Sequence, residues 1–152
     1  MRIRKATLRD VGGILILCKK LEDSHQKDGE NAPTSFMKSK RSILEKDISS
    51  GKGAVFLSED EEGFIGYVFV VKIPPKEKAG KNSAGYISDL YVEEKYRKSG
   101  LGSELIKEAQ EWLRKKGKKN VTLHVESWNI GAINLYRKLE FKDKSIRMEK
   151  KL

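Results

Sequence analysis

A basic turn with two glycines is the part of the chain best suited to chemistry. Residues 90–103 read Leu-Tyr-Val-Glu-Glu-Lys-Tyr-Arg-Lys-Ser-Gly-Leu-Gly-Ser, which runs from an apolar strand into the start of a helix. Glycine lets successive backbone N–H groups approach an anion, and the helix dipole adds partial positive charge there. Arg97 and Lys98 contribute two full charges. This combination predicts a phosphate-binding site.

The two common nucleotide motifs do not fit this turn. A dinucleotide fingerprint needs a third glycine where the chain has Leu105. A P-loop needs Gly-Lys-Ser/Thr, whereas the chain reads Gly102-Ser103-Glu104. The plain structural alternative is that Gly100 is a turn residue and that Arg97 and Lys98 are solvated charges.

Metal and disulfide chemistry are not expected. Cys18 and His25 have no cluster of ligands around them in the sequence, so we predict no metal site. A single cysteine excludes an internal disulfide and fits a reducing compartment. Because Met1 is followed by Arg, Ile, Arg and Lys without an apolar stretch, no signal peptide is read, and we expect a cytoplasmic protein.

Strand and helix signals alternate around the turn, and these elements must position it. Thr7 and Asp10 have the spacing of a capping box that starts the first helix. The polar segments 23–33 and 74–83 are expected to be loops. Strands are predicted at 2–6, 54–58, 64–73, 84–92, 120–126 and 146–152, and helices at 7–21, 37–48, 100–116 and 130–138. The order β-α-α-β-β-β-α-β-α-β predicts an α/β fold, with a mixed sheet and helices on its faces.

Length and charge narrow the class of protein. The 152 residues fit one domain, 1–152, and 38% hydrophobic content supplies a core. No apolar run approaches the roughly 20 residues of a membrane span, so no membrane partner is expected. The net charge of +10 favours an anionic partner. Nine Lys/Arg against three Glu in residues 95–119 would suit nucleic acid, but interleaved aromatics are missing, and a solvated helix end explains the same charges.

Two motifs resemble those of the GNAT superfamily of acyl-CoA-dependent N-acyltransferases. Arg97-Lys98-Ser99-Gly100-Leu101-Gly102 resembles the signature Arg/Gln-x-x-Gly-x-Gly/Ala, and Asn129 to Tyr136 matches Asn-x-x-Ala-x-x-x-Tyr. Leu90-Tyr91-Val92 is similar to the acyl-CoA-binding strand. The resemblance implies a central, mostly antiparallel sheet with helices on both faces, and acetyl-CoA as cosubstrate.

The resemblance also implies cofactor-binding roles. Backbone groups of Leu90 and Val92, on either side of Tyr91, would pair with the pantetheine arm. Asn129 would hydrogen-bond the pantetheine, a role compatible with that of helix N-cap. Coenzyme A pyrophosphate would lie on the backbone N–H groups of the turn and the helix start, from Lys98 through Ser99, Gly100, Leu101 and Gly102 to Ser103, assisted by Arg97.

Three further side chains become catalytic candidates through the same resemblance. Tyr136 would protonate the leaving thiolate, and its alternative is a core tyrosine. Asp89 and Glu126 are the candidate bases for the attacking amine, with ordinary strand-end carboxylates as the alternative. Catalysis by positioning alone, without a dedicated base, is a third possibility.

The resulting hypothesis is an N-acetyltransferase in which an amine attacks acetyl-CoA directly in a ternary complex. The alternative is a basic nucleic-acid-binding module without catalysis, although nucleic acid is the less favoured partner. The acceptor, a small-molecule or protein amine, stays open, as does a homodimer. The family usually reads Gly-Phe where this chain has Glu140-Phe141, which leaves the geometry of the exit from the last helix open. The final segment of this chain is short, so we expect the usual last hairpin to be cut down and that side of the acceptor cleft to be open.

Overall fold

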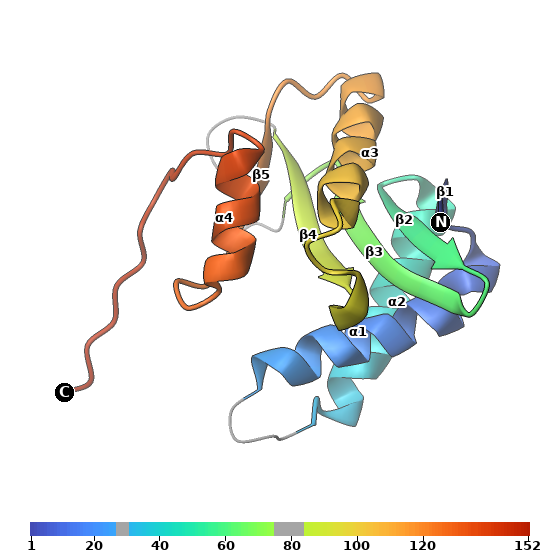
Figure 1. Cartoon of the computed structure of the whole chain (residues 1–152), viewed down its shortest axis with the longest axis horizontal. Helices are drawn as coiled ribbons and strands as arrows, with labels where there is room; N and C mark the ends of the chain where they lie inside the picture. The colour runs from blue at the N-terminus through green and yellow to red at the C-terminus, as the bar shows by residue number, and fades with distance from the viewer. Residues whose placement is uncertain (27–30, 75–83) are drawn as a thin grey trace.

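A five-stranded sheet forms the centre of the protein in the computed structural model, which describes residues 1–26, 31–74 and 84–152 (Figure 1). The strands follow one another across the sheet in chain order. They are β1 (Arg2–Lys5), β2 (Gly53–Asp60), β3 (Gly63–Val71), β4 (Gly85–Val92) and β5 (Val121–Leu123). Neighbours are antiparallel from β1 to β4, and β5 lies parallel to β4. The predicted mixed, mostly antiparallel sheet is confirmed.

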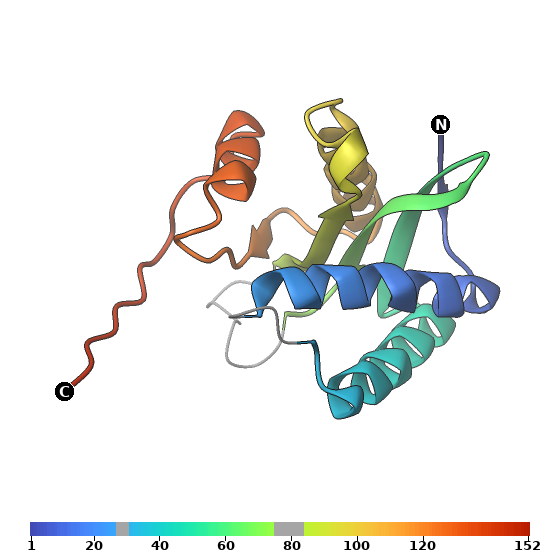
Figure 2. The same ribbon diagram turned by 60° about the horizontal axis from the view of Figure 1, so that its bottom comes forward.

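Helices cover both faces of this sheet, as predicted. The helices are α1 (Val11–His25), α2 (Thr34–Ser50), α3 (Leu101–Lys115) and α4 (Ile130–Lys138), with short 3-10 turns η1 (Leu8–Asp10) and η3 (Glu94–Tyr96). Figure 2 shows α1 and α2 on one face and α3 on the other. Tyr67 and Phe69 of β3 pack toward α1 and α2, whereas Val68 and Val70 pack toward α3. Because both faces are buried, β3 is apolar along most of its length rather than alternating.

Several predicted boundaries are wrong. The first helix begins with the turn η1 and continues to His25, past the start of the loop predicted at 23–33. The rest of that loop includes residues 27–30, and the loop predicted at 74–83 includes 75–83, which lie outside the described residues. The fifth strand is shorter than the predicted 120–126.

The strand predicted at 146–152 is not formed. The described residues 139–152 contain neither helix nor strand, and they run away from the sheet in both views (Figures 1 and 2). Alternating apolar residues identify a face that suits a sheet, but a strand also requires a neighbouring backbone to pair with.

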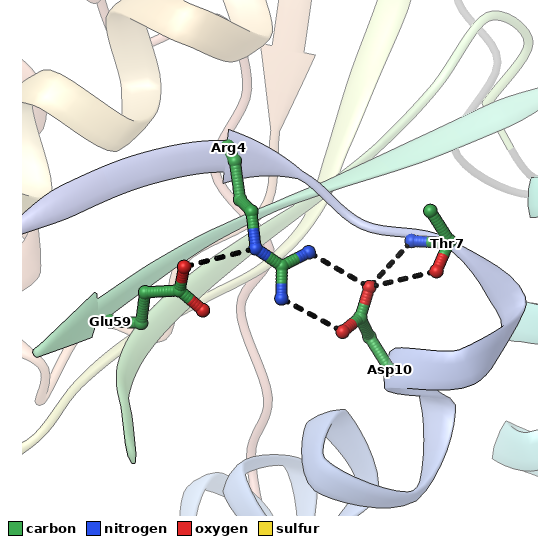
Figure 3. Close-up of polar contacts among 4 residues, drawn as sticks. All are labelled: Arg4, Thr7, Asp10 and Glu59. Carbon is green, nitrogen blue, oxygen red and sulfur yellow. Dashed lines mark hydrogen bonds and ion pairs between the residues drawn. The ribbon is translucent and has the colours of Figure 1, made fainter. Parts of the chain in front are cut away.

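A polar clamp fixes β1 against the start of α1 (Figure 3). Arg4 donates from Nη1 and Nη2 to the two carboxylate oxygens of Asp10, each at 2.9 Å, and from Nε to Glu59 at 3.1 Å. Asp10 also accepts from the Thr7 backbone N–H at 2.7 Å and from its hydroxyl at 3.1 Å, which confirms the capping box. The Arg4 guanidinium holds the pKa of Asp10 well below its usual range.

We expect Asp10→Asn to destabilise the protein by about 1–3 kcal/mol at pH 7, because a charged, bidentate hydrogen-bond acceptor is lost from a mostly buried site. The depressed pKa of Asp10 means that its stabilisation is complete above the ordinary carboxyl pKa, near 4, and is lost as the pH falls toward the folded-state value. Urea unfolding at pH 7 and pH 3 measures this difference. Glu111→Gln, which removes two exposed ion pairs in α3, is the control with a small effect. An equal gap between wild type and Asp10→Asn at both pH values would contradict the assignment.

Candidate active site

The two parallel strands part after a short stretch of pairing. Gly85, Tyr86 and Ile87 of β4 pair with Val121, Thr122 and Leu123 of β5. β4 then continues to Val92, whereas β5 ends at Leu123. We call the edge of β4 beyond Ile87, on the side away from β3, the opening. The register of β4 with β3 shifts at the same place, because Val70 pairs with Ile87 and Phe69 pairs with Asp89. Ser88 is therefore the extra residue of a β-bulge, which bends the strand where the opening begins.

Backbone groups of two residues in β4 face this opening. The N–H of Glu93 donates to the carbonyl of Ile65 in β3 at 2.9 Å, so the groups of Glu93 point toward β3. Backbone groups alternate in direction along a strand, which turns those of Leu90 and Val92 toward the opening. The carbonyl of Val92 accepts from Arg97 Nε at 3.0 Å there. The opening thus offers strand-type hydrogen bonds to an extended ligand.

The turn before α3 has the conformation of an anion-binding loop. Lys98 (φ 62°) and Gly100 (φ 92°) both lie in the left-handed region. The Ser99 hydroxyl donates to the carbonyl of Tyr96 at 2.6 Å and accepts from the N–H of Leu101 at 3.4 Å, which holds the turn closed. N–H groups in the first turn of a helix have no partner within the helix, so they remain available to an anion.

Gly102 has a different role from Gly100. A Cβ atom at Gly102 would lie 3.2 Å from Cδ2 of Leu135 in α4 and 4.0 Å from Cδ2 of Leu90. The glycine therefore lets α4 and β4 approach the start of α3 closely. Arg97, in the same turn, lies over the ring of Tyr91, with Cζ 5.9 Å from the ring centroid.

Helix α4 ends with a glycine-type turn although no glycine is present. The N–H of Phe141 donates to Tyr136 O and that of Glu140 to Arg137 O, both at 3.0 Å, which is the Schellman pattern. Glu140 adopts φ 66°, at a cost of about 1–2 kcal/mol for a residue with a Cβ atom. The rings of Phe141 and Tyr136 are 5.7 Å apart. The chain therefore leaves α4 through the turn that a glycine usually makes, and Glu140 adopts the strained left-handed backbone conformation.

Two predicted site residues, Asn129 and Tyr136, lie at the start of α4 and within it. Asn129 Oδ1 accepts from the N–H of Ala132 at 3.3 Å, so it is the helix N-cap. The pKa of Tyr136 is raised to about 12, mainly by burial. The electrostatic effects of Asp89 and of Tyr86 raise it further. The Asp89 carboxylate is therefore close enough to act on Tyr136 electrostatically, and the phenol is protonated at neutral pH.

Asp89 lies in a nearly buried ion pair on the α1 and α2 face of the sheet. Its Oδ2 is 2.5 Å from Lys40 Nζ of α2, and the two side chains are 14% and 11% exposed. The same oxygen accepts from the Tyr67 hydroxyl at 3.1 Å. Lys40 also lies 5.2 Å from the centroid of the Phe69 ring. Lys40 was missed in the sequence because it lies in a basic stretch, Lys38 to Arg41, that has the composition of a solvated helix face.

Comparison with known proteins identifies the family to which this chain belongs. Residues 18–141 match the acetyltransferase (GNAT) family. The chain belongs to the GNAT family. Its fold is that of solved GNAT-like structures. A Bacillus halodurans protein is 21% identical, with a TM-score of 0.78 and full coverage of both chains. A predicted acetyltransferase of Clostridium acetobutylicum, solved with acetyl-CoA, is 16% identical, with a TM-score of 0.77 over 99% of this chain and 95% of that one.

Sequence relatives match a shorter part of the chain. Thialysine N-ε-acetyltransferase of Sus scrofa is 40% identical over 58 residues, which is 38% of this chain and 34% of that protein. The chain spans about a third of the length of the curated relatives it matches. The family predicted from the two motifs is confirmed.

The structure brings most of the predicted GNAT site residues to one region. Leu90 and Val92 border the opening, the turn from Arg97 to Ser103 follows directly, and Tyr136 reaches Asp89 electrostatically. Glu126 differs, because its side chain is 59% exposed and contacts His124 Nε2 at 3.3 Å. The roles of all these residues remain predictions.

Two further features of this GNAT protein are the burial of its cysteine and the placement of the side chains that could bind a metal. Cys18 is 2% exposed, and burial raises the pKa of its thiol to about 11, so it is unsuited to act as a nucleophile. Within residues 1–26, 31–74 and 84–152, no three His, Cys, Asp or Glu side chains are grouped as metal ligands. In that same part of the chain, every helix is too short or too polar to cross a membrane.

Proposed function

We propose that this GNAT protein transfers the acetyl group of acetyl-CoA to a primary amine by direct attack in a ternary complex. The observation that carries the proposal is the opening beside β4, where backbone groups of Leu90 and Val92 point away from β3. A pantetheine arm is extended and carries amide groups, so it suits strand-type pairing along this edge. The basic turn that follows β4 provides N–H groups and positive charge for phosphates.

The same geometry orders the reacting groups. A ligand whose phosphates lie at the start of α3 and whose arm follows Val92 and Leu90 directs its far end toward Asp89 and Tyr136. Asp89 would accept the proton of the incoming amine, and the Tyr136 hydroxyl would protonate the departing thiolate. The C–N bond forms as the C–S bond breaks, with the thioester carbonyl oriented by backbone N–H groups of β4. Cys18 is buried, so its thiol is not accessible for an acyl-enzyme step.

The Asp89–Lys40 ion pair sets a condition for a cationic acceptor. An acceptor ammonium that approaches Asp89 meets a carboxylate already balanced by Lys40, so it must share or displace that lysine. A relative named for acetylation of thialysine at its side-chain nitrogen favours an alkyl primary amine as the class. Free small molecules and protein amines both contain such a group, and the proposal covers both.

Ligand binding and product release test the function together. We expect acetyl-CoA and coenzyme A to raise the unfolding temperature in a saturable way, with little response to an oligonucleotide at several salt concentrations. A panel of alkyl amines with a free-thiol readout then identifies acceptors. Initial rates with both substrates varied should give intersecting reciprocal plots. Stabilisation by DNA alone would reject the enzyme, and parallel plots would reject direct attack.

A further inference from the structure

The two carboxylate oxygens of Asp89 differ in how fully they are occupied. Oδ2 lies 2.5 Å from Lys40 Nζ and accepts a hydrogen bond from the Tyr67 hydroxyl at 3.1 Å. In the described part of the chain, Oδ1 accepts only from the hydroxyl of the exposed residue Ser88, at 3.4 Å. A carboxylate can accept about four hydrogen bonds. Oδ1 can therefore bind a second cation while Lys40 stays on Oδ2.

The Lys40 ammonium is held in place by two contacts. It is paired with Asp89, and its Nζ lies 5.2 Å from the centroid of the Phe69 ring. The aromatic ring attracts a cation independently of the carboxylate. An ammonium has three N–H donors, and the ion pair with Asp89 occupies one of them. Lys40 can therefore bind an anion beside Asp89 without leaving its place.

The charges of Asp89 and Lys40 limit which acceptor can bind beside them. In residues 1–26, 31–74 and 84–152, these two side chains form ion pairs with each other and with no other residue. Because both side chains are mostly buried, an ammonium bound at Oδ1 would leave one positive charge unbalanced away from water, which is costly. A diamine would add a further positive charge to a protein whose net charge is already +10. A carboxylate on the acceptor itself would restore neutrality.

We propose that the acceptor is a primary amine with a carboxylate a few bonds away, as in a free amino acid, and that Lys40 binds this carboxylate. The ammonium of the acceptor lies on Oδ1 of Asp89, and its carboxylate accepts from Lys40 Nζ. Asp89 and Lys40 thus bind a zwitterion in which each charge meets its opposite. The inference rests on the proposed function, because it takes Asp89 to be the group that receives the amine.

Pairs of acceptors that differ only in the carboxylate test the proposal. Each probe is a free amino acid, from glycine and β-alanine to the common α-amino acids, and its partner is the corresponding carboxamide. We expect the wild type to use the best amino acid with a kcat/KM about 10-fold or more above that of its carboxamide, mainly through KM. Equal use of the two, or preference for the carboxamide or for a diamine, would overturn the proposal.

The source of the carboxylate is tested with two peptides. An N-terminal aspartate presents an amine and a side-chain carboxylate a few bonds apart, whereas an N-terminal asparagine lacks the charge. Acetylation of the aspartate peptide in preference to every free amino acid would assign the zwitterion to a protein acceptor. Preference for a free amino acid would assign it to a small molecule.

Variants of Lys40 show whether this lysine recognises the carboxylate. Lys40→Met should lower the ratio of kcat/KM for acid over carboxamide by about 10-fold or more, whereas Lys40→Arg keeps the charge and should retain most of the ratio. The different basicity of the two amines cancels, because the same pair is compared in each protein. Lys38→Met changes an exposed lysine of the same helix and is the control with an unchanged ratio. An unchanged ratio in Lys40→Met would overturn the proposal.

Calorimetric titration of acceptors into the protein loaded with coenzyme A measures binding without turnover. The wild type should bind the acid more tightly than the carboxamide, and Lys40→Met should lose this difference. Lys40→Met leaves Asp89 unpaired, so a thermal scan must show that it is folded. If it is not, equal affinity of the wild type for acid and carboxamide would still reject the site.

The same assays separate this inference from the proposed function. Acetylation of amines without any preference for a carboxylate would reject the zwitterion site alone. Absence of transfer to every amine would reject the proposed function, and the zwitterion site with it.

Discussion

Tyr136→Phe is expected to lower kcat for acetyl transfer by about 100-fold or more, while the dissociation constant of acetyl-CoA stays nearly unchanged. The variant removes only the hydroxyl and keeps the ring that packs on Phe141. Because the pKa of Tyr136 is raised to about 12, the phenol remains protonated between pH 6 and 10, and the loss should be similar across this range.

Single-turnover thiol release measures the chemical step, and calorimetric titration measures acetyl-CoA binding. Tyr96→Phe is a matched control, since the Tyr96 hydroxyl contacts Asp60 and not the opening. A chemical step with an unaltered rate in Tyr136→Phe would remove the residue from the acid role. An equal loss in both variants would show a general effect on the fold.

The second large effect is expected at Asp89. Asp89→Asn keeps the size of the side chain and removes the negative charge that pairs with Lys40 and lies beside the Tyr67 hydroxyl. If Asp89 accepts the amine proton, kcat/KM for the acceptor should fall by about 100- to 1000-fold, with little change in acetyl-CoA binding.

Glu126→Gln is the companion variant, because both carboxylates were candidate bases from the sequence. Its exposed position predicts a rate close to that of the wild type. A large loss for Glu126→Gln with none for Asp89→Asn would assign the base to Glu126. Small effects for both variants would indicate that catalysis depends on positioning of the reactants and not on a dedicated base.

Local sequence predicted the parts of the site that are contiguous in the chain. The turn from Arg97 to Gly102, the N-cap at Asn129 and the clamp residues Thr7 and Asp10 each depend on residues within a few positions of one another. The spacing of such residues is enough to predict their geometry, because caps and turns are made by the local backbone.

Features that join distant segments could not be predicted in this way. Lys40 and Asp89 meet because α2 lies on the face of the sheet toward which the Asp89 side chain points, which no local pattern specifies. The bulge at Ser88 is marked only by a polar break in an apolar strand. The strand predicted at 146–152 was wrong because its residue pattern specifies an apolar face and not the chain that covers it.

The short pairing of β4 with β5 has a consequence for how the molecule unfolds. Strands β2, β3 and β4 are paired with one another over most of their length, whereas β5 is joined to β4 by three register pairs. Helix α4 contains no fully buried residue. The part from β5 onward is therefore expected to open locally at a lower free energy than the rest. The candidate site lies between the strands up to β4 and the part of the chain from β5 onward. A ligand that contacts both parts would therefore make them unfold together as one cooperative unit.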